Sequence, residues 1–146
     1  MHQLGMNCVL FFKVGGIAGG GAWLAANNVR DATLNMEANE TDVTTRGNAG
    51  WEATAPTLRK ASVDTEVIWD PAEPFFTALK NAFMAVSAAE RVIGIRAMSA
   101  ASDGEGLQAD MAVSKFSRSE DLEDAVKVSV TLKPTYSATP PTWITN

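Results

Sequence analysis

The sequence has few of the residues on which most enzymes and metal proteins depend. Its 146 residues include one cysteine, Cys8, and one histidine, His2. A single cysteine excludes an intrachain disulfide and a cysteine-based zinc site. A single histidine at the chain start excludes Ser-His-Asp and Cys-His catalysis and histidine-based metal sites. We therefore expect a protein that is not an enzyme and needs no cofactor. Cys8 lies in an apolar pattern, which predicts a buried, inert thiol.

Basic residues and long apolar runs are also scarce. Twelve Lys and Arg face seventeen Asp and Glu, so the net charge is −5. Tight nucleic-acid binding needs basic side chains, so the composition disfavours it but allows a surface that DNA passes without binding. The apolar run Cys8–Phe12 is too short to span a membrane and lacks the charged start of a signal peptide. We expect an intracellular product without membrane association.

Two motifs could suggest a ligand, and neither has the spacing that its chemistry requires. The glycine-rich segment Gly15–Gly21 has no Lys-Ser/Thr pair after it and no GxGxxG spacing, so a hairpin or hinge connection is expected instead of a phosphate loop. Asp103 and Glu105 lie in a Gly/Ser turn but do not match an EF-hand loop. They are expected to be solvated turn charges.

Alternating apolar and polar residues predict a mainly β protein. Hydrophobic residues make up 46% and charged residues 20%, which is typical of one soluble domain. The clearest strand is Lys60–Trp69, with an apolar face opposite Asp64 and Glu66. The spacing of the strands favours an antiparallel sandwich or barrel. The other predicted strands are Asn7–Val14, Arg30–Glu37, Glu90–Met98, Leu107–Phe116 and Ala125–Lys133.

One segment has the pattern of a helix. Asp70-Pro71-Ala72-Glu73 resembles a capping box with proline at the first helical position, which predicts a helix over residues 71–88. Its apolar stripe is expected to pack on the sheet, with a ligand pocket as the alternative. The stripe consists of Phe75, Leu79, Ala82, Phe83 and Val86.

Three segments lack such periodicity. Residues 1–6 are expected to form an N-terminal arm. Residues 134–146 are rich in Pro and Thr and are expected to form an extended C-terminal arm, with Tyr136 and Trp143 as candidate anchors. Residues 39–57 are polar and long for a loop, and such loops are usually functional or disordered. We interpret residues 39–57 as an assembly loop.

The order of several motifs resembles a known family. They are DVTTRG at Asp42–Gly47, VIWDP at Val67–Pro71, FSRS at Phe116–Ser119 and VSVTLKP at Val128–Pro134. From Ala32 to Pro134 the chain resembles the major tail proteins, or tail tube proteins, of long-tailed bacteriophages. The resemblance implies a single tail-tube domain over residues 1–146. Its implied fold is a two-sheet antiparallel β-sandwich with a flanking helix and a long inter-subunit loop.

The resemblance also implies a function. Six copies would form a ring, and stacked rings would form a hollow conduit through which DNA passes transiently during infection. The protein would be made in the bacterial host cytoplasm and located in the virion tail. Its partners would be its own copies and the terminator, tape measure and distal tail proteins. Gene transfer agents and contractile injection or secretion machines contain similar tubes, so these are alternative settings.

Candidate site residues follow from the loop and the strand faces. Arg46 and Trp51 are expected to anchor the loop contact, because Arg and Trp dominate interface energetics. The alternative for Trp51 is burial in the core of its own subunit. The acidic faces are candidates for the tube lumen, where they would repel DNA, or they could face the outer solvent. The loop candidates are Asp42, Thr44, Thr45, Arg46 and Trp51, and the lumen candidates are Asp64, Glu66 and Asp110.

A second functional class is compatible with the same pattern. A soluble β-sandwich could bind a sugar or protein ligand in a concave pocket lined by aromatic side chains. That hypothesis requires Trp23, Trp51, Trp69 and Trp143 to converge.

Overall fold

A computed structural model describes residues 2 and 4–146, which form an antiparallel β protein with one α-helix. The predicted mainly β class with a single flanking helix is confirmed. The helix is α1 (Pro74–Met84), and 3₁₀ turns lie at Gly5–Asn7, Arg46–Asn48 and Ala88–Arg91. The strands are β1 (Val9–Val14), β2 (Leu24–Ala25), β3 (Val29–Asp42), β4 (Thr54–Ile68), β5 (Ile93–Met98), β6 (Glu105–Ser119), β7 (Lys127–Pro134) and β8 (Thr142–Thr145).

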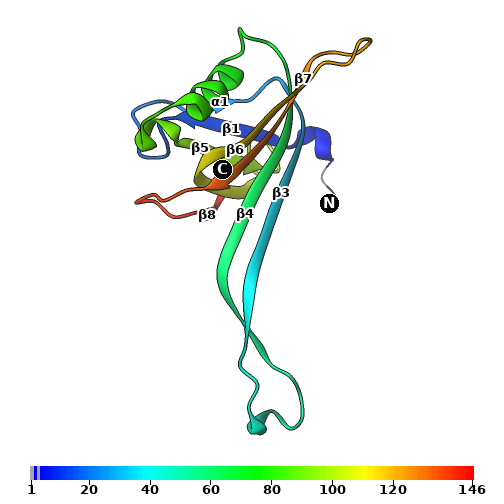
Figure 1. Cartoon of the computed structure of the whole chain (residues 1–146), viewed down its shortest axis with the longest axis vertical. Coiled ribbons are helices and arrows are strands. Elements are labelled where there is room, and N and C mark those ends of the chain that lie inside the picture. Colours follow the sequence, from blue (N-terminus) through cyan, green and yellow to red (C-terminus); the bar gives the residue numbers. More distant parts are fainter. Residues whose placement is uncertain (1, 3) are drawn as a thin grey trace.

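The strands belong to one continuous sheet with the order β2-β1-β5-β6-β7-β4-β3, and β8 pairs with β6. Strand β6 connects two halves. Its residues 106–111 pair with β5, and its residues 111–119 pair with β7. In Figure 1, β1 runs across the view whereas β3 and β4 run along the long axis. The two layers expected for a sandwich are therefore halves of a single sheet that share β6.

Both halves and α1 contribute to one core. The alternation predicted for Lys60–Trp69 is confirmed, because Val63, Thr65 and Val67 are buried on one face of β4. Phe12 of β1 packs against Phe75 of α1 with ring centroids 5.0 Å apart. The remaining large buried apolar residues are Leu10, Phe76, Leu79, Ile93, Ile95, Leu107, Met111, Val128, Val130 and Leu132.

The helix begins later and ends earlier than predicted. Its N-cap is Glu73 and its first residue is Pro74. Asp70 instead closes a turn, since its Oδ1 accepts a hydrogen bond of 3.0 Å from the Ala72 N–H. The sequence holds two successive acid-proline pairs, and only the second starts the helix. Because α1 ends at Met84, Val86 lies outside it and is exposed, so the predicted stripe was wrong at this position.

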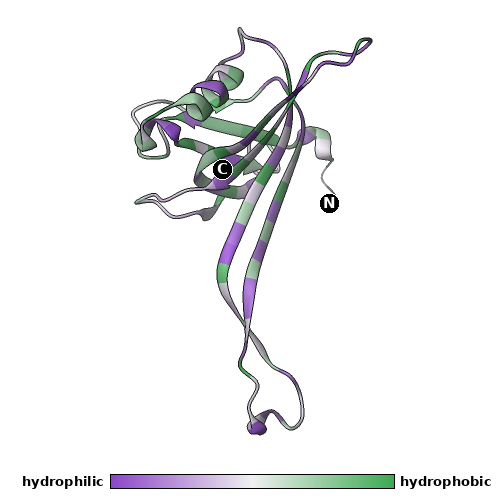
Figure 2. Ribbon diagram, viewed as in Figure 1, coloured by the Kyte–Doolittle hydropathy of each residue, from purple (hydrophilic) through white to green (hydrophobic). Residues whose placement is uncertain are grey.

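The predicted loop 39–57 is the outer part of a β-hairpin. Strand β3 continues to Asp42 and β4 begins at Thr54, so the connecting loop spans only residues 43–53. The hairpin projects far from the body (Figure 1), and both hydrophilic and hydrophobic residues lie along its arms (Figure 2). Away from the body both of its faces are open to solvent. Hydrophobic periodicity therefore carries little strand signal there.

The N-terminal region differs from the expectation in two ways. Residues 5–7 form a 3₁₀ turn and β1 starts at Val9, so Cys8 precedes the strand and is exposed rather than buried. Residues 1 and 3 of the predicted N-terminal arm lie outside the described residues.

The C-terminal arm ends in a short edge strand. Strand β8 pairs with residues 105–108 of β6, and Trp143 lies opposite Leu107. The arm is thus anchored at its end, while Tyr136 is fully open to solvent.

We predict that Leu132→Ala destabilises the fold by about 2–5 kcal/mol, because it removes a fully buried side chain and leaves a cavity. Leu58→Ala is the matched control, since Leu58 is 74% exposed on the hairpin. The control should change the free energy of unfolding by less than about 0.5 kcal/mol. Urea unfolding followed by tryptophan fluorescence measures both values. Equal losses for the two variants would contradict this description of the core.

Candidate assembly surfaces

The tip of the β3–β4 hairpin has an ordered backbone. The Asp42 Oδ1 accepts a 2.8 Å hydrogen bond from the Thr44 N–H, and the Thr44 Oγ accepts one of 2.8 Å from the Ala53 N–H. Thr44, through its side chain and then its backbone N–H, holds the pKa of the Asp42 carboxyl below 3.8. A depressed pKa means that this interaction is present above pH 3.8 and is lost as the pH falls through the lower folded value. Asp42 and Thr44 therefore order the loop locally.

The tip presents large side chains to solvent. Thr45 precedes the 3₁₀ turn Arg46–Asn48, and the loop then reverses through Ala49 and Gly50, both with positive φ. Trp51 is 79% exposed and lies far from the core, so it does not fold back onto its own subunit. An exposed Trp at the end of a projecting hairpin is a candidate contact for another chain.

The sheet half formed by β6, β7, β4 and β3 has two open edges. Strand β3 pairs only with β4, and residues 112–119 of β6 pair only with β7, in the part of the chain that the structure describes. Each edge therefore presents unpaired backbone N–H and C=O groups. Natural proteins cover or block long edges of this kind, because such edges pair readily with another strand.

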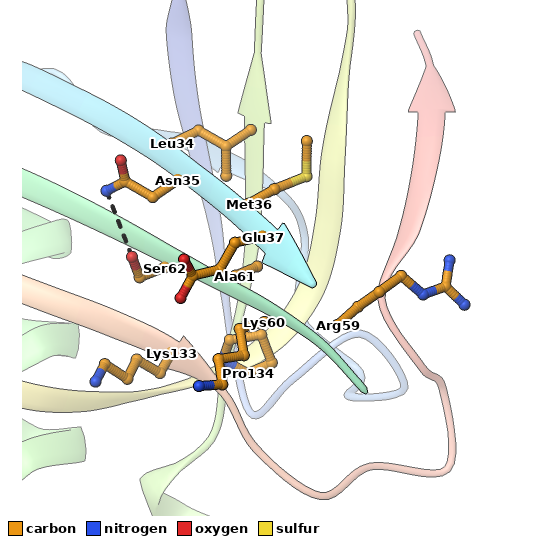
Figure 3. A pocket seen from close by; sticks show the side chains of 10 residues that line it. All are labelled: Leu34, Asn35, Met36, Glu37, Arg59, Lys60, Ala61, Ser62, Lys133 and Pro134. Atoms are coloured by element: carbon orange, nitrogen blue, oxygen red, sulfur yellow. Dashed lines mark hydrogen bonds between the residues drawn. The ribbon is translucent and has the colours of Figure 1, made fainter. Parts of the chain in front are cut away.

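A third open edge lies on the hairpin itself. Strand β7 ends at Pro134, and β4 continues towards Thr54 without a neighbour on that side among the described residues. A groove of 740 Å³ lies at this point. Figure 3 shows Lys60 and Lys133 on one side of the sheet and Met36 and Arg59 on the other.

The face of this half-sheet that points away from the core is polar. Asp64 is exposed and accepts hydrogen bonds from Asn35 Nδ2 at 2.9 Å and Thr131 Oγ at 2.8 Å. The Glu66 Oε1 lies 3.9 Å from the Arg30 Nη1, which makes an ion pair between β4 and β3. Four acidic side chains share this face with four lysines, so the face is balanced rather than acidic. Its charged residues are Asp31, Glu37, Asp64 and Glu66 together with Lys60, Lys115, Lys127 and Lys133.

Unlike Asp64, Asp110 is buried, so its prediction as a lumen residue is corrected. It is 6% exposed. Its Oδ1 accepts a 2.6 Å hydrogen bond from the Ile17 N–H, and its Oδ2 accepts one from the Ser137 hydroxyl. Its backbone C=O accepts one of 3.1 Å from the Thr135 N–H. The alternation on β6 placed Asp110 on a polar face, but the glycine-rich loop and the C-terminal arm cover it.

This contact gives the glycine-rich segment a structural role. Gly16 has φ = +89°, and a Cβ there would lie 2.9 Å from the Asp110 Oδ1. Glycine therefore allows the loop to approach the carboxylate closely. Asp110 ties the loop after β1 to the arm after β7.

The four tryptophans do not converge. Trp23 stacks under Arg96, whose Cζ is 4.0 Å from the ring centroid, and Trp69 packs on Phe76 with centroids 4.5 Å apart. Trp51 is at the hairpin tip and Trp143 on β8. The aromatic pocket required for a ligand-binding module is therefore absent from the described chain.

The described residues contain neither clustered metal ligands nor a long apolar helix. No group of three or more His, Cys, Asp or Glu residues is placed to hold a metal ion. No helix there is long and apolar enough to cross a bilayer.

Open sheet edges, a projecting hairpin and the lack of a shared aromatic pocket define a class of β protein whose prominent surfaces suit contact with other chains. Comparison with known proteins gives the family. A family model described as phage tail tube protein matches residues 3–135. The chain belongs to the phage tail tube protein family. No curated protein sequence matches it directly.

Solved structures share the fold at low identity. The tail of an empty gene transfer agent particle, refined with C6 symmetry, has a TM-score of 0.75 at 14% identity and covers 99% of each chain. The tail tube of SPP1 has a TM-score of 0.70 at 11% identity, covering 90% of this chain and 75% of that one. The baseplate of the anti-feeding prophage has a TM-score of 0.65 at 8% identity, covering 99% and 97%.

We predict that Asp110→Ala releases the glycine-rich loop and the C-terminal arm, because it removes both side-chain hydrogen bonds. Each bond to a carboxylate contributes about 1.5–3 kcal/mol. Amide hydrogen exchange should accelerate at Ile17 and at residues 135–139 more than in β4. Asp110→Asn keeps the side-chain shape and one acceptor oxygen, so it should show a smaller effect. Unchanged exchange at Ile17 in the Ala variant would contradict the role of Asp110.

Proposed function

We propose that six copies of the chain form a ring and that stacked rings form the tube of a phage tail. The observation that carries this proposal is the half-sheet with two open edges. Edge strands of adjacent copies can pair, so that the half-sheets join around the ring into one barrel without unpaired edges. The C6 symmetry of the gene transfer agent tail supports a sixfold ring.

The strand directions support closure. The four strands β6, β7, β4 and β3 are all antiparallel to their neighbours. With an even number of strands, β3 of one copy runs antiparallel to β6 of the next in a cyclic ring. Every junction can therefore use the antiparallel pairing already present within the chain.

The polar face suits the wall of a conduit. It would line the lumen, with Asp64 and Glu66 among its side chains, because the opposite face is buried in the core. Its balanced charges avoid the continuous basic surface that binds DNA phosphates tightly. DNA would thus pass without specific binding, and the protein would reside in the virion tail.

The projecting hairpin would reach another copy. Arg46 and Trp51 at its tip would anchor that contact, since they combine a guanidinium with a large exposed ring. The terminator, tape measure and distal tail proteins would meet the tube at its ends and inside it. The same subunit design would serve a gene transfer agent or a contractile injection machine.

We predict that replacing Val43–Ala53 with Asn-Gly abolishes tube formation and leaves the fold intact. Asp42 and Thr54 are paired, so a two-residue turn can join them without disturbing β3 or β4. Circular dichroism and thermal unfolding report the fold, and negative-stain microscopy reports the tubes. A variant that still forms tubes would contradict the role of the tip.

Trp51→Ala tests the same contact with a single change. It should raise the protein concentration needed for assembly by about tenfold or more, since anchoring Trp residues often contribute over 1.4 kcal/mol. Glu52→Gln, at the exposed neighbouring residue, is the matched control and should assemble normally. If both variants need the same protein concentration for assembly, Trp51 is not an anchor of the contact.

A further inference from the structure

The two open edges of the half-sheet carry opposite charge. Strand β3 has four acidic residues and one basic residue, Arg30, which lies near Glu66 of its own sheet. Residues 112–119 of β6 include Lys115 and Arg118 and no acidic residue. The acidic residues of β3 are Asp31, Glu37, Glu40 and Asp42.

Lys115 is the available cation on the β6 edge. Arg118 is already engaged, since its guanidinium lies 2.7 Å from Glu120 and 5.0 Å from the centroid of the Trp69 ring. Lys115 is exposed and has no ion-pair partner among the described residues. Its ammonium is free to meet a carboxylate on another chain.

The register places Lys115 on the same face as two of the β3 carboxylates. Lys115 lies opposite Thr131, Thr131 opposite Asp64, and Asp64 opposite Thr33. Thr33 shares its face with Asp31 and Glu37, because side chains on alternate residues point the same way.

This arrangement tolerates several registers between copies. Pairing that keeps the faces aligned can shift only in steps of two residues. Lys115 would then lie opposite Asp31, Thr33, Asn35 or Glu37 of the next copy. In each case an acidic residue is directly opposite or at the diagonal position, which a long side chain can reach.

We propose that Lys115 of one copy pairs with Asp31 or Glu37 of the next and thereby selects head-to-tail pairing around the ring. The proposal rests on the proposed tube function and identifies the partner surface as β3 of a second copy. The same charges oppose two wrong pairings. Two β3 edges would bring carboxylates together, and two β6 edges would bring cations together. A β3–β3 contact would produce a closed twofold dimer and stop ring growth.

The test compares charge reversal at the edge with the same reversal outside the half-sheet. Lys115→Glu should raise the concentration needed for assembly by about tenfold or more, because an attractive cross-strand pair becomes repulsive at every junction. Lys80→Glu is the matched control, since Lys80 is an exposed lysine on α1, outside the half-sheet and the groove. It should assemble nearly as well as the unchanged protein. Thermal unfolding checks that both variants fold.

A charge swap tests the partner. Adding Asp31→Lys and Glu37→Lys to Lys115→Glu should restore assembly at the original concentration, as followed by sedimentation and negative-stain microscopy. Normal assembly of Lys115→Glu would overturn the inference while leaving the tube function intact. Equal loss in Lys115→Glu and Lys80→Glu, or no recovery in the swapped variant, would also overturn it. Failure of the unchanged protein to form rings would instead contradict the proposed function.

Discussion

The backbone N–H and C=O groups at two edges of the half-sheet lack hydrogen-bond partners in the described chain. The rest of the structure depends on this one constraint. Strand β3 and residues 112–119 of β6 present open edges. A long open edge promotes aggregation of an isolated protein. In a protein that assembles, the same edge can form the interface with another copy. In the proposed ring, this constraint also accounts for the opposite charges of β3 and of residues 112–119 of β6, because the interface must select the correct edge and disfavour the others.

The body supports these edges by packing a hydrophobic core against one face of the half-sheet. Strand β6 belongs to both halves, so the buried residues of β1, β5, β7 and α1 pack around a shared strand. Asp110 sits near the middle of β6 and ties down the glycine-rich loop and the C-terminal arm. A buried carboxylate with a partner for each oxygen is stable only when those partners are held in place. The core and the Asp110 hydrogen bonds thus support the base of the hairpin and the open edges.

The sequence predicted elements with one buried face and failed where that contrast disappears. Lys60–Trp69 was clear because Val63 and Val67 alternate with Asp64 and Glu66. The outer hairpin was missed because both of its faces meet solvent, and periodicity then carries no information. Asp110 was misplaced because alternation reports a face but not what covers that face. The helix start was shifted because Asp70-Pro71 and Glu73-Pro74 carry the same local signal. The family resemblance added what residue patterns lacked, namely the expectation that the assembly loop over residues 39–57 reaches between subunits.

The most direct test of this account is a helical reconstruction by electron cryo-microscopy of the purified protein after assembly. The account predicts a hollow tube in which β3 of each copy pairs antiparallel with residues 112–119 of β6 in the next copy, with Asp64 and Glu66 facing the lumen. A protein that stays monomeric at all concentrations, or a tube in which these two edges remain exposed to solvent, would contradict it.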